Sequence, residues 1–182
     1  MKYLFVALCL FSMTNAVELF YDDGTPQWLS YGNANAAVWF YTEDFFPSTS
    51  SVQITEVEMW FYHHSSYPWD TSEFYLEIWS GDDESFLEEQ LYQSLETAVH
   101  YFPILIDVSQ ENITVGSDFW ILENNELSAG GWPSAILDGS PPVVPHSYGD
   151  EGWITEGDLL FRCFADELSI ESISWGALKI TF

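Results

Sequence analysis

Short runs in which every second residue is apolar recur along most of the chain. Two of them are VEMWFY, residues 57–62, and EFYLEIW, residues 73–79. An extended strand places alternate side chains on opposite faces, so each run would present one apolar face and one mixed face. This pattern predicts half-buried β-strands rather than helices.

The same reading predicts a chain built almost entirely of strands. We expect them near residues 18–21, 35–41, 52–62, 73–79, 88–95, 101–107, 118–123, 133–137, 144–148 and 159–165. Turn sequences rich in Gly, Pro, Asp and Ser, such as DDGTP and SGDDES, separate them. Residues 84–98 also carry leucines four apart, which suits a helix, but the surrounding rhythm favours a strand. The prediction is an all-β, two-sheet antiparallel β-sandwich that is jelly-roll-like.

The two ends of the chain differ from this strand-rich middle. Residues 1–16 combine Lys2, the apolar run YLFVALCLF and small residues, which is typical of a secretory signal peptide cut after Ala16. The apolar run is too short to span a bilayer, and no later segment is long enough. We therefore expect a β-sandwich domain over 17–165 in a secreted or cell-surface protein. Residues 166–182 would be a linker or the start of a further module.

The charge balance excludes one class of partner. The 182-residue chain has 29 acidic residues and three basic ones, a formal net charge of −26. Binding to nucleic acid requires basic side chains that neutralise phosphates, so a nucleic-acid partner is excluded. Disorder is also excluded, because 47% of the residues are hydrophobic and 18% are aromatic.

Cysteine and histidine offer little chemistry. Cys163 would be the single cysteine after signal removal, so no disulfide can form within the mature chain, and LLFRCF predicts a buried thiol. The histidines, at positions 63, 64, 100 and 146, are expected at solvated loop edges rather than at a metal.

Acidic loops make a structural Ca²⁺ ion possible. Hard cations prefer carboxylate and carbonyl oxygens in loops. The candidate ligands are Asp22, Asp23, Asp82, Asp83, Asp138 and Asp158. The alternative is ordinary turn chemistry beneath a solvated acidic surface, because none of these loops has the ligand spacing of an EF-hand.

The mixed faces of the two opening runs carry large aromatic rings beside carboxylates. They comprise Glu58, Trp60 and Tyr62 in the first run and Glu73, Tyr75, Glu77 and Trp79 in the second. If the two strands pair as a hairpin, the rings would share one water-facing surface. Because flat rings stack on the apolar faces of sugars and carboxylates accept hydroxyl hydrogen bonds, this surface would bind carbohydrate. The alternative is that a loop, for instance from residues 124–158, covers the rings as a second core layer.

Enzymatic motifs do not appear in the sequence. It contains no G-x-S-x-G elbow, no H-E-x-x-H helix and no phosphate-binding glycine loop. The acidic pairs do not match the E-x-D-x-x-E strand of jelly-roll glucanases, so we expect no catalysis, with a glycoside-active enzyme as the least favoured reading.

The order of several segments resembles the β-sandwich accessory modules appended to secreted bacterial peptidases and surface proteins. FYDDGTP opens the domain, Val115, Gly116, Asp118 and Phe119 match a mid-domain strand motif, and Asp158, Leu159 and Arg162 match the closing one. The resemblance implies a noncatalytic jelly-roll domain and carries over no binding residues. ESISWGALKITF resembles a linker that precedes C-terminal sorting or anchor modules.

Together these patterns predict a noncatalytic extracellular binding or adhesion module. Its partner would be a polysaccharide or a cell-surface protein. The alternative is a structural spacer or protein–protein interaction domain of a larger surface protein.

Overall fold

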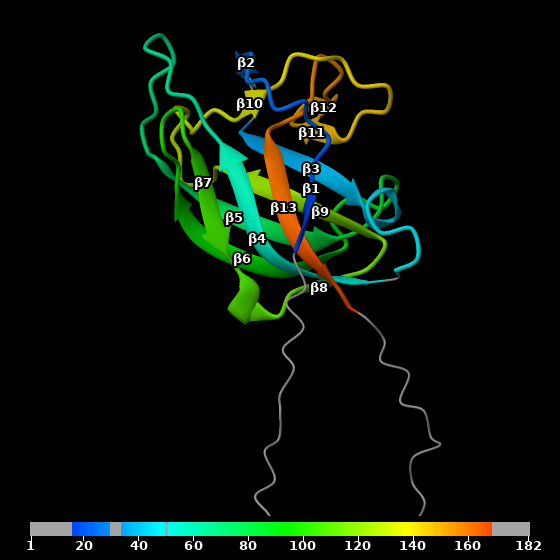
Figure 1. Ribbon diagram of the computed structural model, residues 1–182. Helices are drawn as coiled ribbons and strands as arrows, with labels where there is room; N and C mark the ends of the chain where they lie inside the picture. The colour runs from blue at the N-terminus through cyan, green and yellow to red at the C-terminus, as the bar shows by residue number, and fades with distance from the viewer. Residues whose placement is uncertain (1–15, 30–33, 50, 169–182) are drawn as a thin grey trace, which may run out of the picture.

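Two antiparallel sheets packed face to face make up the protein (Figure 1). The computed structural model describes residues 16–29, 34–49 and 51–168. The five-stranded sheet has the order β1 (Val17–Leu19), β13 (Phe161–Glu167), β4 (Val52–Trp60) and β7 (Pro103–Asp107), with β8 (Thr114–Val115) also paired to β4. The six-stranded sheet has the order β12 (Gly152–Trp153), β11 (Ser147–Gly149), β3 (Asn35–Tyr41), β9 (Asp118–Asn124), β5 (Glu73–Ser80) and β6 (Glu89–Thr97).

The remaining elements are short. Strands β2 (Trp28–Leu29) and β10 (Ile136–Leu137) pair with each other at one end of the sandwich, and η1 (Thr42–Asp44) and η2 (Ser109–Glu111) are single 3₁₀ turns. Among the described residues, no helix has the length and hydropathy needed to cross a bilayer. The predicted signal peptide falls almost wholly, and the predicted linker largely, outside the described residues.

The predicted all-β sandwich is confirmed, and most predicted strands lie within a few residues of the observed ones. Most of the ambiguous leucine segment forms β6, an extended strand paired with β5, whereas Leu87 lies in the loop before it. The last strand runs to Glu167 instead of residue 165, because Asp166 and Glu167 still pair with Gln53 and Val52 of β4.

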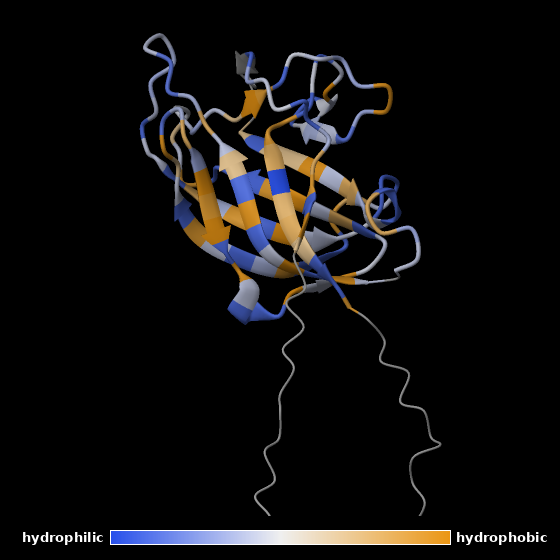
Figure 2. Cartoon of the chain, in the orientation of Figure 1, coloured by the Kyte–Doolittle hydropathy of each residue, from blue (hydrophilic) through white to orange (hydrophobic). Residues whose placement is uncertain are grey.

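The apolar faces of the alternating strands meet between the sheets. Figure 2 shows apolar and polar bands alternating along the strands. Val57, Met59 and Phe61 are fully buried on one side of the core, as the alternation predicts. Phe74 of β5 comes from the opposite sheet, and its ring centroid lies 5.0 Å from that of Phe61.

The condition for a shared aromatic surface, that β4 and β5 pair as a hairpin, is not met. Strand β4 pairs with β13, β7 and β8, and β5 pairs with β6 and β9. The two runs therefore belong to different sheets and contact each other only through their apolar faces. Their mixed faces point outward on opposite sides of the sandwich.

Cys163 is fully buried in β13, as expected from its apolar neighbours. Burial alone raises the pKa of its thiol far above the ordinary range. Because the thiolate is the reactive form, we expect Cys163 to resist a thiol-alkylating reagent in the native protein and to react once urea unfolds it. Mass-spectrometric mapping of the Cys163 peptide measures this, and rapid native labelling would contradict the packing described.

Candidate functional site

A second apolar cluster lies on the outer face of the six-stranded sheet, away from the main core. Trp120, Leu122 and Ala37 are buried there, with Trp39 and Tyr148 packed against them. In β9 the sequence DFWILEN is apolar on both faces, because Phe119 and Ile121 fill the main core while Trp120 and Leu122 point outward. This strand therefore requires a cover on its outer side.

The cover comes from the loop 81–88, which connects β5 to β6. The ring of Phe86 lies edge-on to Trp120 with centroids 4.5 Å apart, and 4.6 Å from Tyr148. The loop bends sharply at Gly81, whose φ is +133° and where a Cβ would lie 2.6 Å from the carbonyl oxygen of Ser85. Asp82 Oδ1 accepts hydrogen bonds from the backbone N–H groups of Glu84 and Ser85, which fixes the bend.

Beside this cluster the outer face is hollowed into a pocket with a volume of about 350 Å³. It is lined by Asn35, Ala37, Glu77, Trp79, Phe86, Leu87, Leu122, Asn124, Tyr148, Gly149 and Asp150. Ala37 pairs with Leu122 on one side and Tyr148 on the other, so its small side chain leaves room for the pocket between larger neighbours.

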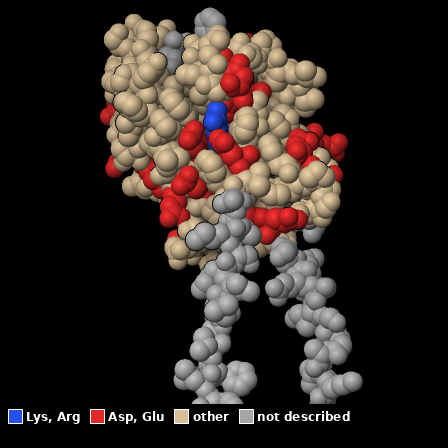
Figure 3. Space-filling view, in the orientation of Figure 1, with Lys and Arg blue, Asp and Glu red and all other residues tan. Residues whose placement is uncertain are grey.

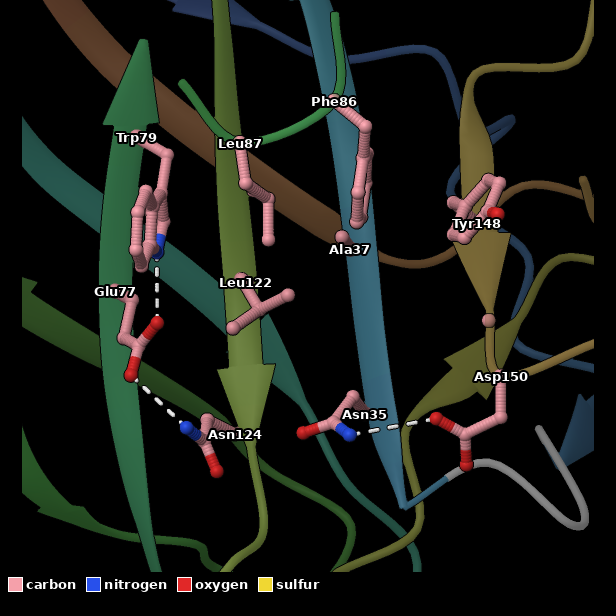
Figure 4. A pocket seen from close by; sticks show the side chains of 11 residues that line it. Asn35, Ala37, Glu77, Trp79, Phe86, Leu87, Leu122, Asn124, Tyr148 and Asp150 are labelled. Atoms are coloured by element: carbon pink, nitrogen blue, oxygen red, sulfur yellow. Dashed lines mark hydrogen bonds between the residues drawn. The ribbon is translucent and has the colours of Figure 1, made fainter. Parts of the chain in front are cut away.

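The pocket has an apolar end and a polar end (Figure 4). The rings of Trp79, Phe86 and Tyr148 lie at one end with Leu87. The polar side chains of the opposite end are those of Glu77, Asn124, Asn35 and Asp150. A cavity with aromatic walls and a few convergent polar groups is the usual form of a small-ligand site.

Glu77 is 4% exposed, and three N–H donors hold its carboxylate in place. Its Oε2 accepts from the indole of Trp79 at 2.7 Å, and its Oε1 accepts from the amides of Gln93 and Asn124 at 2.9 Å each. An ionised carboxylate offers about four acceptor positions, so Glu77 retains capacity for a ligand hydroxyl or ammonium.

Asn35 and Asp150, the polar residues on the other side of this end, come from β3 and from the turn after β11. Asp150 is exposed and accepts hydrogen bonds from the backbone N–H of Ala34 and, at 3.3 Å, from the side-chain amide of Asn35. These bonds fix its carboxylate at the rim of the pocket.

The structure divides the predicted aromatic platform. Of its members, Trp79 and Glu77 line the pocket, whereas Tyr75 lies on the same face of β5 but outside the lining. Trp60 and Glu58 lie on the five-stranded sheet, and Tyr62 follows β4 and packs against His100. The seven residues of the predicted surface, with Glu73 at the start of β5, therefore do not form one surface, because β4 and β5 do not pair.

One local motif explains why glutamate and tryptophan share these faces. On each strand the indole N–H of the tryptophan donates to the glutamate two residues earlier, at 2.8 Å from Trp60 to Glu58 and at 2.7 Å from Trp79 to Glu77. The carboxylate satisfies the buried edge of the ring, and the ring face stays available for packing or a ligand.

The predicted Ca²⁺ ligands fall into two separate groups. Asp22 is bound by Arg162, whose Nε donates to its Oδ2 at 3.0 Å. Asp138 accepts the backbone N–H groups of Asp23, Ser140 and Asp158, so the two aspartate loops and Asp158 lie together. Burial raises the pKa of Asp158 to about 6, partly offset by a hydrogen bond from Ser147.

Asp82 and Asp83 lie in the loop 81–88, where Asp82 caps the bend. Within the described residues, no group of three or more His, Cys, Asp or Glu side chains is arranged to hold a metal ion.

One histidine differs from expectation. His146 is buried rather than solvated, and its ring stacks between Tyr21, at 3.4 Å between centroids, and Trp39, at 5.1 Å. Burial lowers its pKa, and the carbonyl of Trp39 can accept from its Nδ1.

Sequence reasoning missed the residues that come from other elements. They are Asn35, Phe86, Asn124, Tyr148 and Asp150. The two-faced hydrophobicity of 118–124 could have shown that β9 is covered on both sides, but nothing local in the chain places Asp150 beside Asn35. Comparison with known protein families, curated proteins and solved structures found no match to this chain.

Proposed function

We propose that the chain is a noncatalytic carbohydrate-binding module, and that its site is the pocket on the outer face of the six-stranded sheet. The observation that carries the proposal is the pairing of a ring wall, Trp79, Phe86 and Tyr148, with oriented carboxylate and amide groups in one cavity. Sugars present both an apolar ring face and hydroxyls, and this cavity offers a partner to each.

The way Glu77 is held favours binding over hydrolysis. Both of its oxygens already accept N–H hydrogen bonds, which suits a fixed acceptor for a hydroxyl. A glycosidase needs one carboxyl that can protonate the leaving oxygen. The resemblance noted from the sequence implies a noncatalytic domain and does not specify its ligand.

The test uses two tryptophans in matched settings. We expect Trp79→Ala to weaken binding of a responding oligosaccharide by about tenfold or more, because it removes the stacking wall. Trp60→Ala removes the same indole–glutamate motif from the opposite sheet and should leave affinity within about twofold. Isothermal titration calorimetry with neutral and amino-sugar oligosaccharides measures both.

Thermal unfolding of the two variants separates lost binding from lost folding. If Trp60→Ala weakens binding as much as Trp79→Ala while both stay folded, the pocket is not the site. If no oligosaccharide binds the unsubstituted protein, the proposed function is wrong.

A further inference from the structure

The pocket has an unusual charge for a general sugar site. Two of its lining residues, Glu77 and Asp150, are acidic, and none of the described lining residues is Lys, Arg or His. Arg162, the one basic residue between positions 16 and 168 apart from histidine, lies on the other sheet, bound to Asp22 and Glu18. Figure 3 shows this basic side chain surrounded by acidic ones.

The carboxylates come from two separate elements. Glu77 projects from β5 and Asp150 follows β11, and Figure 4 shows them on opposite sides of the polar end. Each is oriented by N–H donors, so a ligand would not have to order it on binding. A protonated amine at either carboxylate would form charge-assisted hydrogen bonds, which are stronger than those of a neutral hydroxyl.

The ring wall adds to the same preference. The faces of Trp79, Phe86 and Tyr148 carry negative electrostatic potential, and a cation close to such a face is attracted to it. An anionic sugar would be repelled by both carboxylates, because the described lining residues include no basic side chain. A neutral sugar would stack on the rings but would not use the charge of the polar end.

We propose that the pocket selects glycans that carry a protonated amino group, such as oligomers of glucosamine. This inference rests on the proposed function and names the ligand class of the same site. The rings of the pocket receive the pyranose face, and Glu77 or Asp150 receives an ammonium group of the oligomer.

The experiment compares oligomers of equal length that differ at the second carbon of the sugar. The probes are a glucosamine oligomer, an N-acetylglucosamine oligomer and a glucose oligomer, titrated near pH 6 in low salt, where the sugar amine is protonated. We expect the glucosamine oligomer to bind about tenfold or more tightly than the other two. A hydrogen bond between charged groups contributes more to the binding free energy than a neutral one, by an amount that corresponds to about this ratio of affinities. Added salt should narrow the difference by screening.

Two variants show whether the pocket or the overall charge is responsible. Glu77→Gln should reduce the preference about tenfold, and Asp150→Asn, at an exposed position, provides the same test if Glu77→Gln unfolds. Glu111→Gln makes the same charge change on η2, which the pocket does not include, and should leave the preference intact. Spermidine, a cation without a sugar ring, should bind about tenfold more weakly than the glucosamine oligomer.

The contrary results distinguish failure of the inference from failure of the proposed function. Equal or tighter binding of the neutral or acetylated oligomer overturns the inference but leaves the proposed function standing. Spermidine binding as tightly as the oligomer, or Glu111→Gln acting like Glu77→Gln, overturns selection of an amino sugar by this pocket. Binding of none of the three oligomers overturns both proposals.

Discussion

Arg162→Met is expected to destabilise the protein by about 3 to 5 kcal/mol, because it leaves a buried charge without its partner. The guanidinium binds Asp22 through two nitrogens, and the Asp22 side chain is 0% exposed. A third nitrogen donates to Glu18 at 3.0 Å. Urea denaturation followed by tryptophan fluorescence gives the loss as a lower midpoint.

Three comparisons separate the effect of the Arg162–Asp22 ion pair on stability from the effect of losing one positive charge in a strongly acidic protein. The double variant Asp22→Asn with Arg162→Met keeps the net charge and should recover part of the loss. Glu18→Gln removes a partner that is 37% exposed and should cost about 1 kcal/mol at most. The effect of Arg162→Met should persist in high salt, which screens distant charges. A loss below about 1 kcal/mol would show that the pair contributes little.

Glu123→Gln should make the protein more stable than the unsubstituted chain above pH 7, because it removes a carboxyl buried among apolar groups. Glu123 points into the main core between Ala36 and Leu76 and is 1% exposed. Burial raises its pKa from 4.5 to about 8, and Asp150 adds to the rise, while a hydrogen bond from Asn125 opposes it.

The direction of the pH dependence follows from proton counting. Between pH 4.5 and about 8 the folded state keeps a proton that the unfolded state has released, so the free energy of unfolding falls as pH rises. The slope is at most about 1.4 kcal/mol per pH unit for one group. The contribution of Glu123 is complete below pH 4.5 and is lost as pH passes its folded pKa.

The measurement is the difference in unfolding free energy between Glu123→Gln and the unsubstituted protein from pH 5 to 9. This difference should grow in favour of the variant up to about pH 8 and then level off. The other acidic groups, Asp158 included, are common to both proteins and largely cancel. Glu111→Gln, at an exposed position, should show a flat difference, and a flat difference for Glu123→Gln would contradict a protonated buried carboxyl.

Burial was predicted correctly for residues whose place depends only on which face of their own strand they occupy. Phe61 and Phe74 are both buried, as predicted. The prediction needed only the alternation of side chains along each strand, which places both residues on an apolar face whichever strand lies beside them. Cys163 follows the same rule. Alternation does not identify the neighbouring strand, and the hairpin of residues 57–62 with 73–79, considered as a condition for a shared surface, does not form.

The candidate site shows the same limit. Glu77 and Trp79 could be singled out because they lie two residues apart on one strand and contact each other. Phe86 reaches the pocket through the turn at Gly81, and Tyr148 and Asp150 reach it because β11 pairs with β3, more than 100 residues away in the chain. Such pairings depend on packing of the whole core.

The sequence by itself determined that this protein is built from strands, which side of each strand is apolar, and that the chain is strongly acidic. The physical reason is that these properties depend on residues close together in the chain or on the sum of all charges. Only the tertiary structure decided which sheet each strand joins and which polar groups meet at one pocket. Alternation of apolar and polar residues specifies which face of a strand is buried, but it does not specify which strand lies beside it. The neighbouring strands are determined by how the apolar faces of both sheets pack together in the whole core.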